Sequence, residues 1–559
     1  MNEQITVTLP DDNSCQSVAL GTQLTELAMR HTSGQPRPWP VLAAYVDNRI
    51  KELRYRVCKP VTVRFIDITS SEGHRVYQRT AIFMLQKAVR ELHPGCRLLV
   101  RHSLGSGIYF EIGGLAPDAR PADVAQALCA RMRAIADADY PVTRSRMTTD
   151  RVREIYRQRG FDDKIALLET RPRLYSDIYT MNDEQGYFYG ALAPSSGCVQ
   201  MFGIEPYLKG FYLMLPDRAD PSVLCGDIHA DKMAHVFSGY KQWVDVMGVP
   251  TVGRLNAKVL AGEAGDLVKV AEAFHEKQLG AIADTIDSAN RDRGLRMVLI
   301  SGPSSSGKTT FAKRLGIQLR ILGLNPVLIS LDDYFVDREK TPLDENGDYD
   351  YEALEAINLE LFNDHLTRLD RGESIAMPRY DFISGRSLLN CTPLTLDDRS
   401  ILVIEGIHGL NPRLTPSIDD AMKFKIYISC FTTVAMDNVA RIHTTDNRLL
   451  RRMIRDSRTR GADAVSTLSR WASVRRGEER HIFPYQENAD VMFNSSLFYE
   501  LPVLRPYAEP LLREVPDTVP VYAEARRMLK FLDDFTPIDA SEVPPSSLLR
   551  EFIGGSSFK

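Results

Sequence analysis

The sequence lacks any apolar segment long enough to cross a membrane as a helix. No run approaches the roughly 18 to 20 residues that a bilayer requires. The first residues, MNEQITVTLPDDNS, contain neither the basic part nor the apolar part of a signal peptide. The 8 cysteines are dispersed without a C-x-x-C pair, which argues against a disulfide framework and a zinc ribbon. We therefore expect a cytoplasmic protein without a membrane partner, in which most cysteines are buried thiols.

An excess of charge of one sign is also absent. The chain has 69 Lys and Arg against 73 Asp and Glu, a formal net charge of -4, so any nucleic-acid partner would have to meet a local patch. The hydrophobic fraction of 44% and the charged fraction of 25% are typical of globular proteins and exclude a collagen-like or low-complexity chain. At about 150 residues per domain, the 559 residues indicate roughly three to four domains.

Residues 297–322, MVLISGPSSSGKTTFAKRLGIQLRIL, combine a β-rich run, a Gly/Ser loop and an amphipathic helix. The loop matches G-x-x-x-x-G-K-T, whose backbone N–H groups can surround phosphate oxygens at a helix N-terminus. Lys308 should reach the outer phosphates of ATP, and the Thr309 hydroxyl should ligate Mg²⁺. The predicted ATP-binding residues are Gly302, Pro303, Ser304, Ser305, Ser306, Gly307, Lys308, Thr309 and Thr310. A simple Gly/Ser turn before a helix is the alternative interpretation.

A second metal-binding carboxylate is expected at the end of a neighbouring buried strand. The run ILVIEG at 401–406 ends in Glu405, which we predict to hold Mg²⁺ together with Thr309. A strand-end surface glutamate is the alternative. Further parallel-strand candidates are VLISL (327–331), FKIYIS (424–429) and ADVMFN (489–494). Alternating with helices, they predict an α/β fold, a P-loop NTPase parallel sheet with flanking helices.

The class of P-loop protein is narrowed by missing motifs. The sequence contains no N-K-x-D or T-K-x-D motif for binding guanine, and Glu405 is followed by glycine as E-G and not as D-x-x-G, so a Ras-like GTPase is disfavoured. The L-S-G-G-Q signature of transporter ATPases is also missing. A small-molecule kinase needs a carboxylate that accepts the proton of the acceptor hydroxyl. The segment ISLDDYF places Asp332 and Asp333 just past a strand end, where they could serve this purpose or form only a turn.

A cluster of arginines follows the next predicted strand. Such a cluster repels itself unless it meets anions, so a lid over the phosphates explains it. A solvated basic helix and an RNA-binding patch are the alternatives. The members are Arg441, Arg448, Arg451, Arg452, Arg455, Arg458 and Arg460.

Together these motifs resemble the uridine kinase family, within the wider uridine kinase and phosphoribulokinase group. The matching pieces are GPSSSGKTT, SLDDYF, PRYDF (378–382), VIEGIHGL, RLLRRMIRDSRTRG (448–461) and ENADVMFN. The resemblance implies that Asp332 is the catalytic base, that Asp350 holds the ribose and that Tyr380 contacts the base. It also implies that Arg452 binds the substrate, and that Arg455 and Arg460 act with Lys308 in catalysis.

The N-terminal half resembles other families. Residues 5–68 are similar in layout to the TGS domain, a β-grasp module. The helix YQRTAIFMLQKAVRELHP and the hairpin LLVRHSLGSGIYFEIGG look like the second additional domain of threonyl- and alanyl-tRNA synthetases. In that family the helix carries an H-x-x-x-H pair, and the matching positions here are Arg79 and Phe83, so the ligands are gone. Cys225 and His229 keep a C-x-x-x-H spacing.

These resemblances divide the chain into five parts. We expect a TGS-like β-grasp domain at 1–68, a synthetase-editing-like α+β region at 69–230, a helical connector at 231–290, a P-loop uridine kinase-like domain at 291–536 and a tail at 537–559. Three positions depart from the uridine kinase pattern, and such losses of hydrogen-bonding groups can redirect the choice of base. They are Phe335, Gly385 and Arg470.

We expect an ATP-dependent, Mg²⁺-requiring kinase that phosphorylates a sugar hydroxyl of a nucleoside or a related small molecule. One alternative is an RNA- or ribosome-associated P-loop NTPase whose N-terminal half contacts RNA. Another is a regulatory module in which the TGS-like domain senses a small ligand. The sequence leaves open the acceptor, the work of the first 290 residues, whether the protein forms a homo-oligomer, and whether Cys225 and His229 bind anything.

Overall fold

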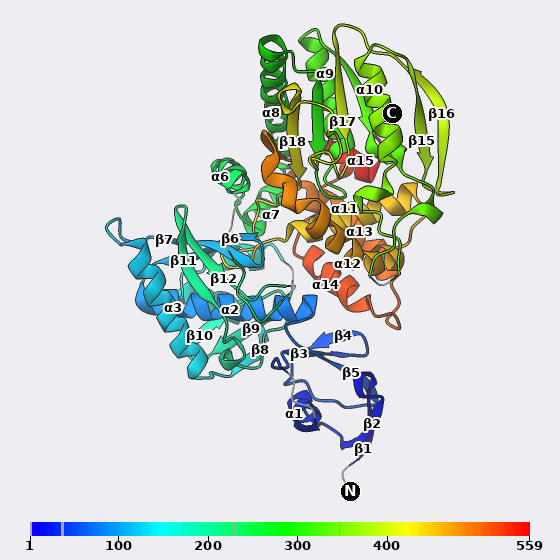
Figure 1. Cartoon of the computed structure of the whole chain (residues 1–559). Coiled ribbons are helices and arrows are strands. Elements are labelled where there is room, and N and C mark those ends of the chain that lie inside the picture. Colours follow the sequence, from blue (N-terminus) through cyan, green and yellow to red (C-terminus); the bar gives the residue numbers. More distant parts are fainter. Residues whose placement is uncertain are drawn as a thin grey trace.

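The computed structural model describes residues 3–34, 38–171, 173–218, 220–226, 231–345 and 347–558. Figure 1 shows a small N-terminal sheet, a second mixed α and β region beside it, and a larger C-terminal half built around a central sheet. His229 lies outside the described residues, so the pair predicted with Cys225 has no structural test.

The first region is a mixed five-stranded sheet with strand order β2-β1-β5-β3-β4, which holds one helix. Strands β1 and β5 are parallel and the other neighbours are antiparallel. Alternating apolar positions such as Val7 and Val63 face Leu24 and Leu27 of the helix in one small core. The elements are β1 (Gln4–Leu9), β2 (Ser14–Ala19), α1 (Leu24–Gly34), β3 (Ala43–Val46), β4 (Arg49–Lys51) and β5 (Val61–Ile66).

The second region is organised around α2 (Ser71–Leu92), a helix of 22 residues whose middle is buried on all sides. Ser70 caps its N-terminus by accepting from Gly73 N. A four-stranded sheet of order β11-β12-β7-β6 and a three-stranded sheet of order β10-β9-β8 surround the helix. The predicted hairpin is confirmed as β6 and β7. The elements are β6 (Arg97–Leu104), β7 (Gly107–Gly113), α3 (Pro121–Asp137), β8 (Val142–Thr148), α4 (Thr149–Gln158), α5 (Asp162–Glu169), β9 (Tyr175–Met181), β10 (Glu184–Gly186), β11 (Gly203–Tyr207) and β12 (Gly210–Met214).

Three helices connect this region to the C-terminal half and pack onto the latter. They are α6 (Asp231–Val246), α7 (Val252–Leu260) and α8 (Ala264–Arg293). Leu279 and Ile286 of α8 share one hydrophobic core with Phe311 and Leu315 of the helix that follows the phosphate loop. Because removing these residues would uncover that core, the three helices contribute to the stability of the C-terminal half.

The C-terminal half is a parallel five-stranded sheet of order β14-β17-β13-β18-β19 with helices on both sides, so the predicted α/β fold with a parallel sheet is confirmed. An antiparallel hairpin, β15 with β16, stands beside the sheet. The strands are β13 (Met297–Ser301), β14 (Asn325–Ser330), β15 (Ile375–Asp381), β16 (Arg386–Leu394), β17 (Ser400–Glu405), β18 (Lys423–Ser429) and β19 (Val491–Asn494). The helices are α9 (Lys308–Ile321), α10 (Leu359–Asp370), α11 (Thr444–Thr459), α12 (Ala464–His481), α13 (Glu500–Arg513), α14 (Tyr522–Leu532) and α15 (Arg550–Ile553).

The segment between β18 and α11 joins the two halves. Val439 is buried in the hydrophobic core of the second region. Val100 N donates to Asn438 O at 2.7 Å, and the buried Lys164 Nζ lies 2.7 Å from the buried Asp437 Oδ2. The C-terminal half therefore inserts part of its own chain into the N-terminal half, directly before the arginine-rich helix α11.

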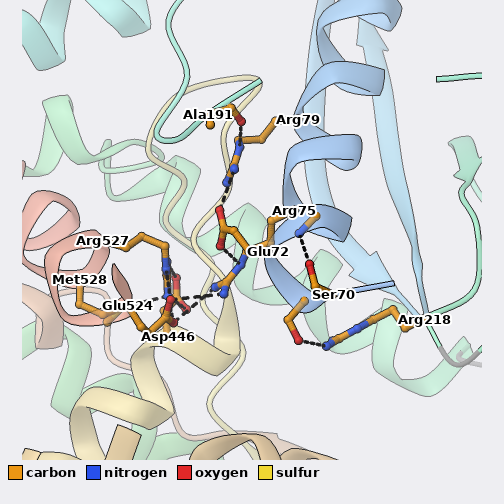
Figure 2. A network of polar contacts seen from close by, with 12 residues as sticks. Ser70, Glu72, Arg75, Arg79, Ala191, Arg218, Asp446, Glu524, Arg527 and Met528 are labelled. Atoms are coloured by element: carbon orange, nitrogen blue, oxygen red, sulfur yellow. Dashed lines mark hydrogen bonds and ion pairs between the residues drawn. The ribbon is translucent and has the colours of Figure 1, made fainter. Parts of the chain in front are cut away.

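A network of charged side chains forms a second junction between the halves, shown in Figure 2. Arg75 of α2 lies 2.9 Å from Glu72 and 3.3 Å from Glu524 of α14. Arg527 contacts Glu524 and both carboxylate oxygens of Asp446, the latter at 2.7 Å each. Asp446 lies in the first turn of α11, so the network connects α2 with the helix that carries the arginine cluster.

The burial of the cysteines differs from the expectation that most of them are buried. All 8 are free thiols, but only Cys225 and Cys430 are buried, and Cys15, Cys58 and Cys391 are exposed. The prediction that most are buried is therefore wrong, because several lie on strand faces or loops outside the cores. Within the described ranges, no helix has the length and apolarity to cross a membrane.

Candidate active site

The phosphate loop connects β13 to α9 at the carboxyl end of the sheet. Gly302 is required by packing, since a Cβ there would lie 2.0 Å from the backbone oxygen of Ile428. Gly307 has a φ of +87°, and a Cβ there would lie 2.5 Å from the Leu548 side chain. Ser305 also adopts a positive φ of 59°. The loop is therefore wound tightly, as the motif predicts.

Lys308 lies across the loop. Its Nζ donates to Gly302 O at 2.9 Å and to Pro303 O at 3.2 Å. Burial lowers the pKa of Lys308, while the carboxylates of Glu405 and Asp332 act against this shift. The ammonium thus lies on the loop carbonyls within reach of the charges of two acids, and a phosphate group could replace the carbonyls as its hydrogen-bond acceptor.

Thr309, Ser330 and Glu405 form the polar centre of the sheet's carboxyl end. The hydroxyls of Thr309 and Ser330 donate to Glu405 Oε1 at 3.0 and 2.9 Å. Burial raises the pKa of Glu405, and the negative charge of Asp332 adds to the rise. Hydroxyl and carboxylate oxygens are the hard donors that Mg²⁺ prefers, so this donor set fits the ion.

The two adjacent acids that follow β14 face different surroundings. Asp332 is half-buried, and its charge acts on both Lys308 and Glu405. Burial raises the pKa of Asp333, whose carboxylate is bonded to the backbone of Tyr380. The structure thus places Asp332 beside the phosphate loop and gives Asp333 a role in holding the β15 hairpin.

Four arginines of α11, together with Arg460 directly after it, fall into two groups. Arg448 and Arg451 are 1% and 0% exposed and form buried ion pairs with Glu478 and Glu500. They also donate to carbonyls of the phosphate loop, Arg448 Nη1 to Ser304 O at 3.1 Å and Arg451 Nη1 to Ser305 O at 3.4 Å. These two arginines stabilise the loop from the protein interior and are not available to an RNA-binding patch. The lid stays a prediction for the other arginines of the cluster.

The other group gathers around Asp456. Arg452, Arg455 and Arg460 lie 3.4, 2.8 and 3.6 Å from its carboxylate oxygens. Arg452 also donates to Ser304 Oγ of the phosphate loop at 3.0 Å. Burial lowers the pKa of Arg460 to about 10, and the nearby Arg455 adds to the shift. One carboxylate thus faces three guanidinium groups, which leaves positive charge for a phosphate to balance.

Asp350 lies on the loop before α10, and two further groups accompany it. His481 Nε2 is 3.6 Å from Asp350 Oδ2, and Glu352 N donates to Asp350 Oδ1 at 3.1 Å. Burial raises the pKa of Glu352 to about 7, although Arg452 opposes the rise. Gly477 of α12 allows this packing, since a Cβ there would lie 2.4 Å from Glu352 Cβ. Sequence reasoning missed His481 and Glu352, although Glu352 stands only two residues from Asp350.

Tyr380 stands in a group of aromatic rings on the hairpin. Its ring centroid is 5.5 Å from that of Phe335 and 5.1 Å from that of Phe382. The guanidinium of Arg460 lies over the Phe382 ring at 4.5 Å. Gly385, at the hairpin turn, has a φ of +72°. Two of the three departures, Phe335 and Gly385, therefore lie at this aromatic group, whereas Arg470 is exposed on α12.

The positions of the lost H-x-x-x-H pair are filled by other contacts. Arg79 donates to Ala191 O at 3.0 Å and to Glu72 Oε1 at 3.1 Å, and Phe83 packs against Phe188 with ring centroids 5.0 Å apart. A cation and an aromatic ring cannot ligate a metal ion. Throughout the described part of the chain, no group of three or more His, Cys, Asp or Glu could hold one.

Comparisons with known proteins find similarity to one sequence family and to several characterised enzymes. Residues 297–498 match the sequence model of the Phosphoribulokinase / Uridine kinase family. A uridine kinase of Halobacterium salinarum is 28% identical over 194 residues, which cover 34% of this chain and 77% of that protein. A uridine kinase of Staphylococcus aureus is 28% identical over 196 residues, 34% of this chain and 84% of that protein.

A threonine–tRNA ligase of Symbiobacterium thermophilum is 29% identical over 203 residues, which cover 36% of this chain and 30% of the ligase. Among solved structures, one described as a possible uridine kinase from Bacillus stearothermophilus is 22% identical. That alignment covers 39% of this chain and 98% of the other, with a TM-score of 0.27. The family match supports a small-molecule kinase domain with a P-loop, and membership of a kinase family implies the use of ATP.

Proposed function

We propose that the protein transfers the γ-phosphoryl group of ATP to a sugar hydroxyl of a nucleoside or a nucleoside-like molecule, because residues 297–498 match the sequence model of the Phosphoribulokinase / Uridine kinase family. The observation that carries this proposal is the position of Asp332. Its charge acts on Lys308 and on Glu405, at the point where the outer phosphates of a nucleotide would lie.

The roles of the site residues follow from their positions. Asp332 orients the acceptor hydroxyl and takes its proton as the oxygen attacks phosphorus, while the bond between phosphorus and the oxygen of ADP breaks. Lys308, Arg455 and Arg460 balance the charge of the group in transfer. Thr309 and Glu405 would hold Mg²⁺, which neutralises phosphate charge when it is bound.

The acceptor is proposed to lie between Asp350 and the aromatic group of Tyr380, Phe335 and Phe382. A carboxylate can accept hydrogen bonds from two neighbouring sugar hydroxyls, and aromatic rings can stack on a flat base. Phe335 offers no hydroxyl to the base, so we expect the site to accept more than one base. Arg452 would contact the acceptor from α11.

The N-terminal half is proposed to serve as a scaffold that resembles a TGS domain and a synthetase second additional domain. The contacts of Arg79 and Phe83 support this role, because they fill the positions where that family binds metal. The burial of Arg448 and Arg451 argues against an RNA-binding patch formed by the arginine cluster. The alternative of an NTPase whose N-terminal half contacts RNA is separate and is distinguished by the acceptor assay.

The test is a comparison of matched acceptors in the presence of ATP and Mg²⁺. We expect ribonucleosides to be preferred over their 2′-deoxy forms by up to about 10⁴-fold in kcat/KM, since a site that hydrogen-bonds a hydroxyl rejects the analogue that lacks it. Equal values for both forms would remove Asp350 from the acceptor site. A strong preference for uridine alone would contradict the relaxed choice of base. Phosphorylation of RNA or of free sugars instead would overturn the nucleoside proposal.

A further inference from the structure

The end of the chain lies directly against the phosphate loop. Leu548 and Phe552 are buried in the core of the C-terminal half, and the Leu548 side chain occupies the space beside Gly307. Arg458 of α11 fixes the backbone here, with Nη2 donating to Glu551 O at 2.8 Å and Nε donating to Phe552 O at 3.2 Å. Figure 1 shows α15, in red, inside the C-terminal half.

The side chain of Glu551 points at the first turn of α9. Its Oε2 accepts from Thr310 Oγ1 at 2.7 Å and from Thr310 N at 3.3 Å. Thr310 is the third residue of α9, so its N–H belongs to the first turn, whose donors have no partner within the helix. These donors, together with the helix dipole, are the ones that a P-loop offers to phosphate groups.

The charge of Glu551 also acts within the site. Burial lowers the pKa of Lys308, and Glu551 is one of the three carboxylates that oppose this shift, after Glu405 and Asp332. The carboxylate is therefore close enough for its charge to act on the ammonium that should hold the outer phosphates. A nucleotide phosphate at Thr310 would meet a negative charge already in place.

We propose that Glu551 is an affinity-determining residue of the nucleotide site, an inference that rests on the kinase function proposed above. Its carboxylate occupies the place of the inner phosphate of ATP. ATP binds only when this side chain rotates away from Thr310. The Thr310 N–H and hydroxyl can then donate hydrogen bonds to the phosphate. Arg458 and the buried Leu548 and Phe552 keep the backbone of the segment in place, so the side chain alone has to move.

The role of Glu551 differs for ligands of different size. Pyrophosphate can fill the outer part of the loop near Lys308 without reaching Thr310, whereas ATP has to fill both places. Removing the negative charge should therefore tighten ATP binding more than pyrophosphate binding. A residue that merely stabilised the fold would show no such difference between the two ligands.

The test is titration calorimetry of the full chain with Mg·ATP and with Mg·pyrophosphate. Glu551→Gln is compared with wild type and with Glu542→Gln, which removes an exposed carboxylate of the same C-terminal segment. We expect Glu551→Gln to bind ATP about three- to tenfold more tightly, the range for one charge at a helix terminus. Glu542→Gln should match wild type for both ligands, and Glu551→Gln should tighten pyrophosphate binding by a smaller factor than ATP binding.

Each other outcome overturns the proposal. If wild type binds ATP and Glu551→Gln binds it equally or more weakly, Glu551 is a structural cap of α9 and the kinase proposal stands. If no variant binds ATP, Glu551 does not limit access and both proposals fail. Should Glu551→Gln not fold, Glu551→Asp serves in its place, because the shorter side chain withdraws the carboxylate from Thr310. The proposal predicts tighter ATP binding for that variant, and weaker or equal binding contradicts it.

Discussion

Two long helices, α2 in the N-terminal half and α11 in the C-terminal half, both carry buried charged side chains, but their charges are balanced differently. Around α2, Arg75, Arg79 and Arg527 face the carboxylates of Glu72, Glu524 and Asp446, three cations against three anions (Figure 2). At the C-terminal end of α11, Arg452, Arg455 and the cap residue Arg460 share the carboxylate of Asp456. The comparison indicates that an excess of arginines over carboxylates beside the phosphate loop favours phosphate binding. Equal numbers of arginines and carboxylates instead favour a structural contact between the two halves.

The largest expected effect belongs to the C-terminal half. Asp332→Asn should lower kcat by about 10²- to 10⁴-fold while the protein still folds and binds ATP, because the proton acceptor is lost and the phosphate loop is kept. Asp333→Asn is the matched control, since that carboxylate is bonded to the backbone of Tyr380. Steady-state kinetics should show a far smaller loss for the control. Near wild-type turnover in Asp332→Asn would show that another group accepts the proton.

For α2 we expect a loss of stability without a loss of turnover. Arg79→Met should lower the free energy of unfolding by about 2–3 kcal/mol, because it leaves the buried Glu72 without this partner. The turnover of the folded enzyme should not change. Chemical denaturation and kinetics on the same sample provide the measurement, with Arg120→Met as control at a position whose side chain is 81% exposed. A selective loss of turnover would place catalytic work in the N-terminal half.

Glu352 provides a test that depends on pH. Its pKa is raised to about 7 by burial, so the folded state keeps its proton at pH values where the unfolded chain has lost it. The free energy of unfolding of wild type should therefore fall as pH rises from about 4.3 through about 7. Glu352→Gln lacks this penalty, so it should exceed wild type by about 1 kcal/mol more at pH 8 than at pH 5. A difference independent of pH would show that Glu352 is not buried in this way.

The smallest expected effect concerns the charged network of Figure 2, where Arg75 of α2 meets Glu524 of α14. A double-mutant cycle with Arg75→Met and Glu524→Gln should give a coupling energy of about 0.5–1 kcal/mol in unfolding, since both side chains are 24% exposed and screened by solvent. The KM for ATP should stay at the wild-type value in both single variants. A change in that KM would show that this network also sets the position of α11.

Much of the site follows from local sequence, and the remainder depends on distant contacts. The phosphate loop, Glu405 and Asp332 stand at strand ends, and parallel strands bring such ends together at one edge of a sheet. The spacing of arginines on α11 could not separate Arg448 and Arg451 from Arg452 and Arg455. That division depends on Glu478 and Glu500, which come from other helices.

The contacts of Glu551 and His481 also depend on residues that are distant in sequence. Glu551 contacts Thr310 across 241 positions of sequence, and no motif in the tail announces that contact. His481 meets Asp350 only because Gly477 lets α12 approach that loop closely. Local patterns therefore predicted the phosphate loop and the acids at the strand ends, while the contacts of Glu551 and His481 required the tertiary structure.

In the proposed reaction, the C-terminal half passes phosphate to a hydroxyl of a small acceptor and not to water. The most direct measurement incubates the full chain with ATP labelled in the γ-phosphate and a mixture of ribonucleosides, then separates the products. We expect labelled nucleoside monophosphate and ADP in equal amounts, with both lost in Asp332→Asn. Labelled inorganic phosphate as the sole product, formed at the same rate with and without acceptor, would contradict it.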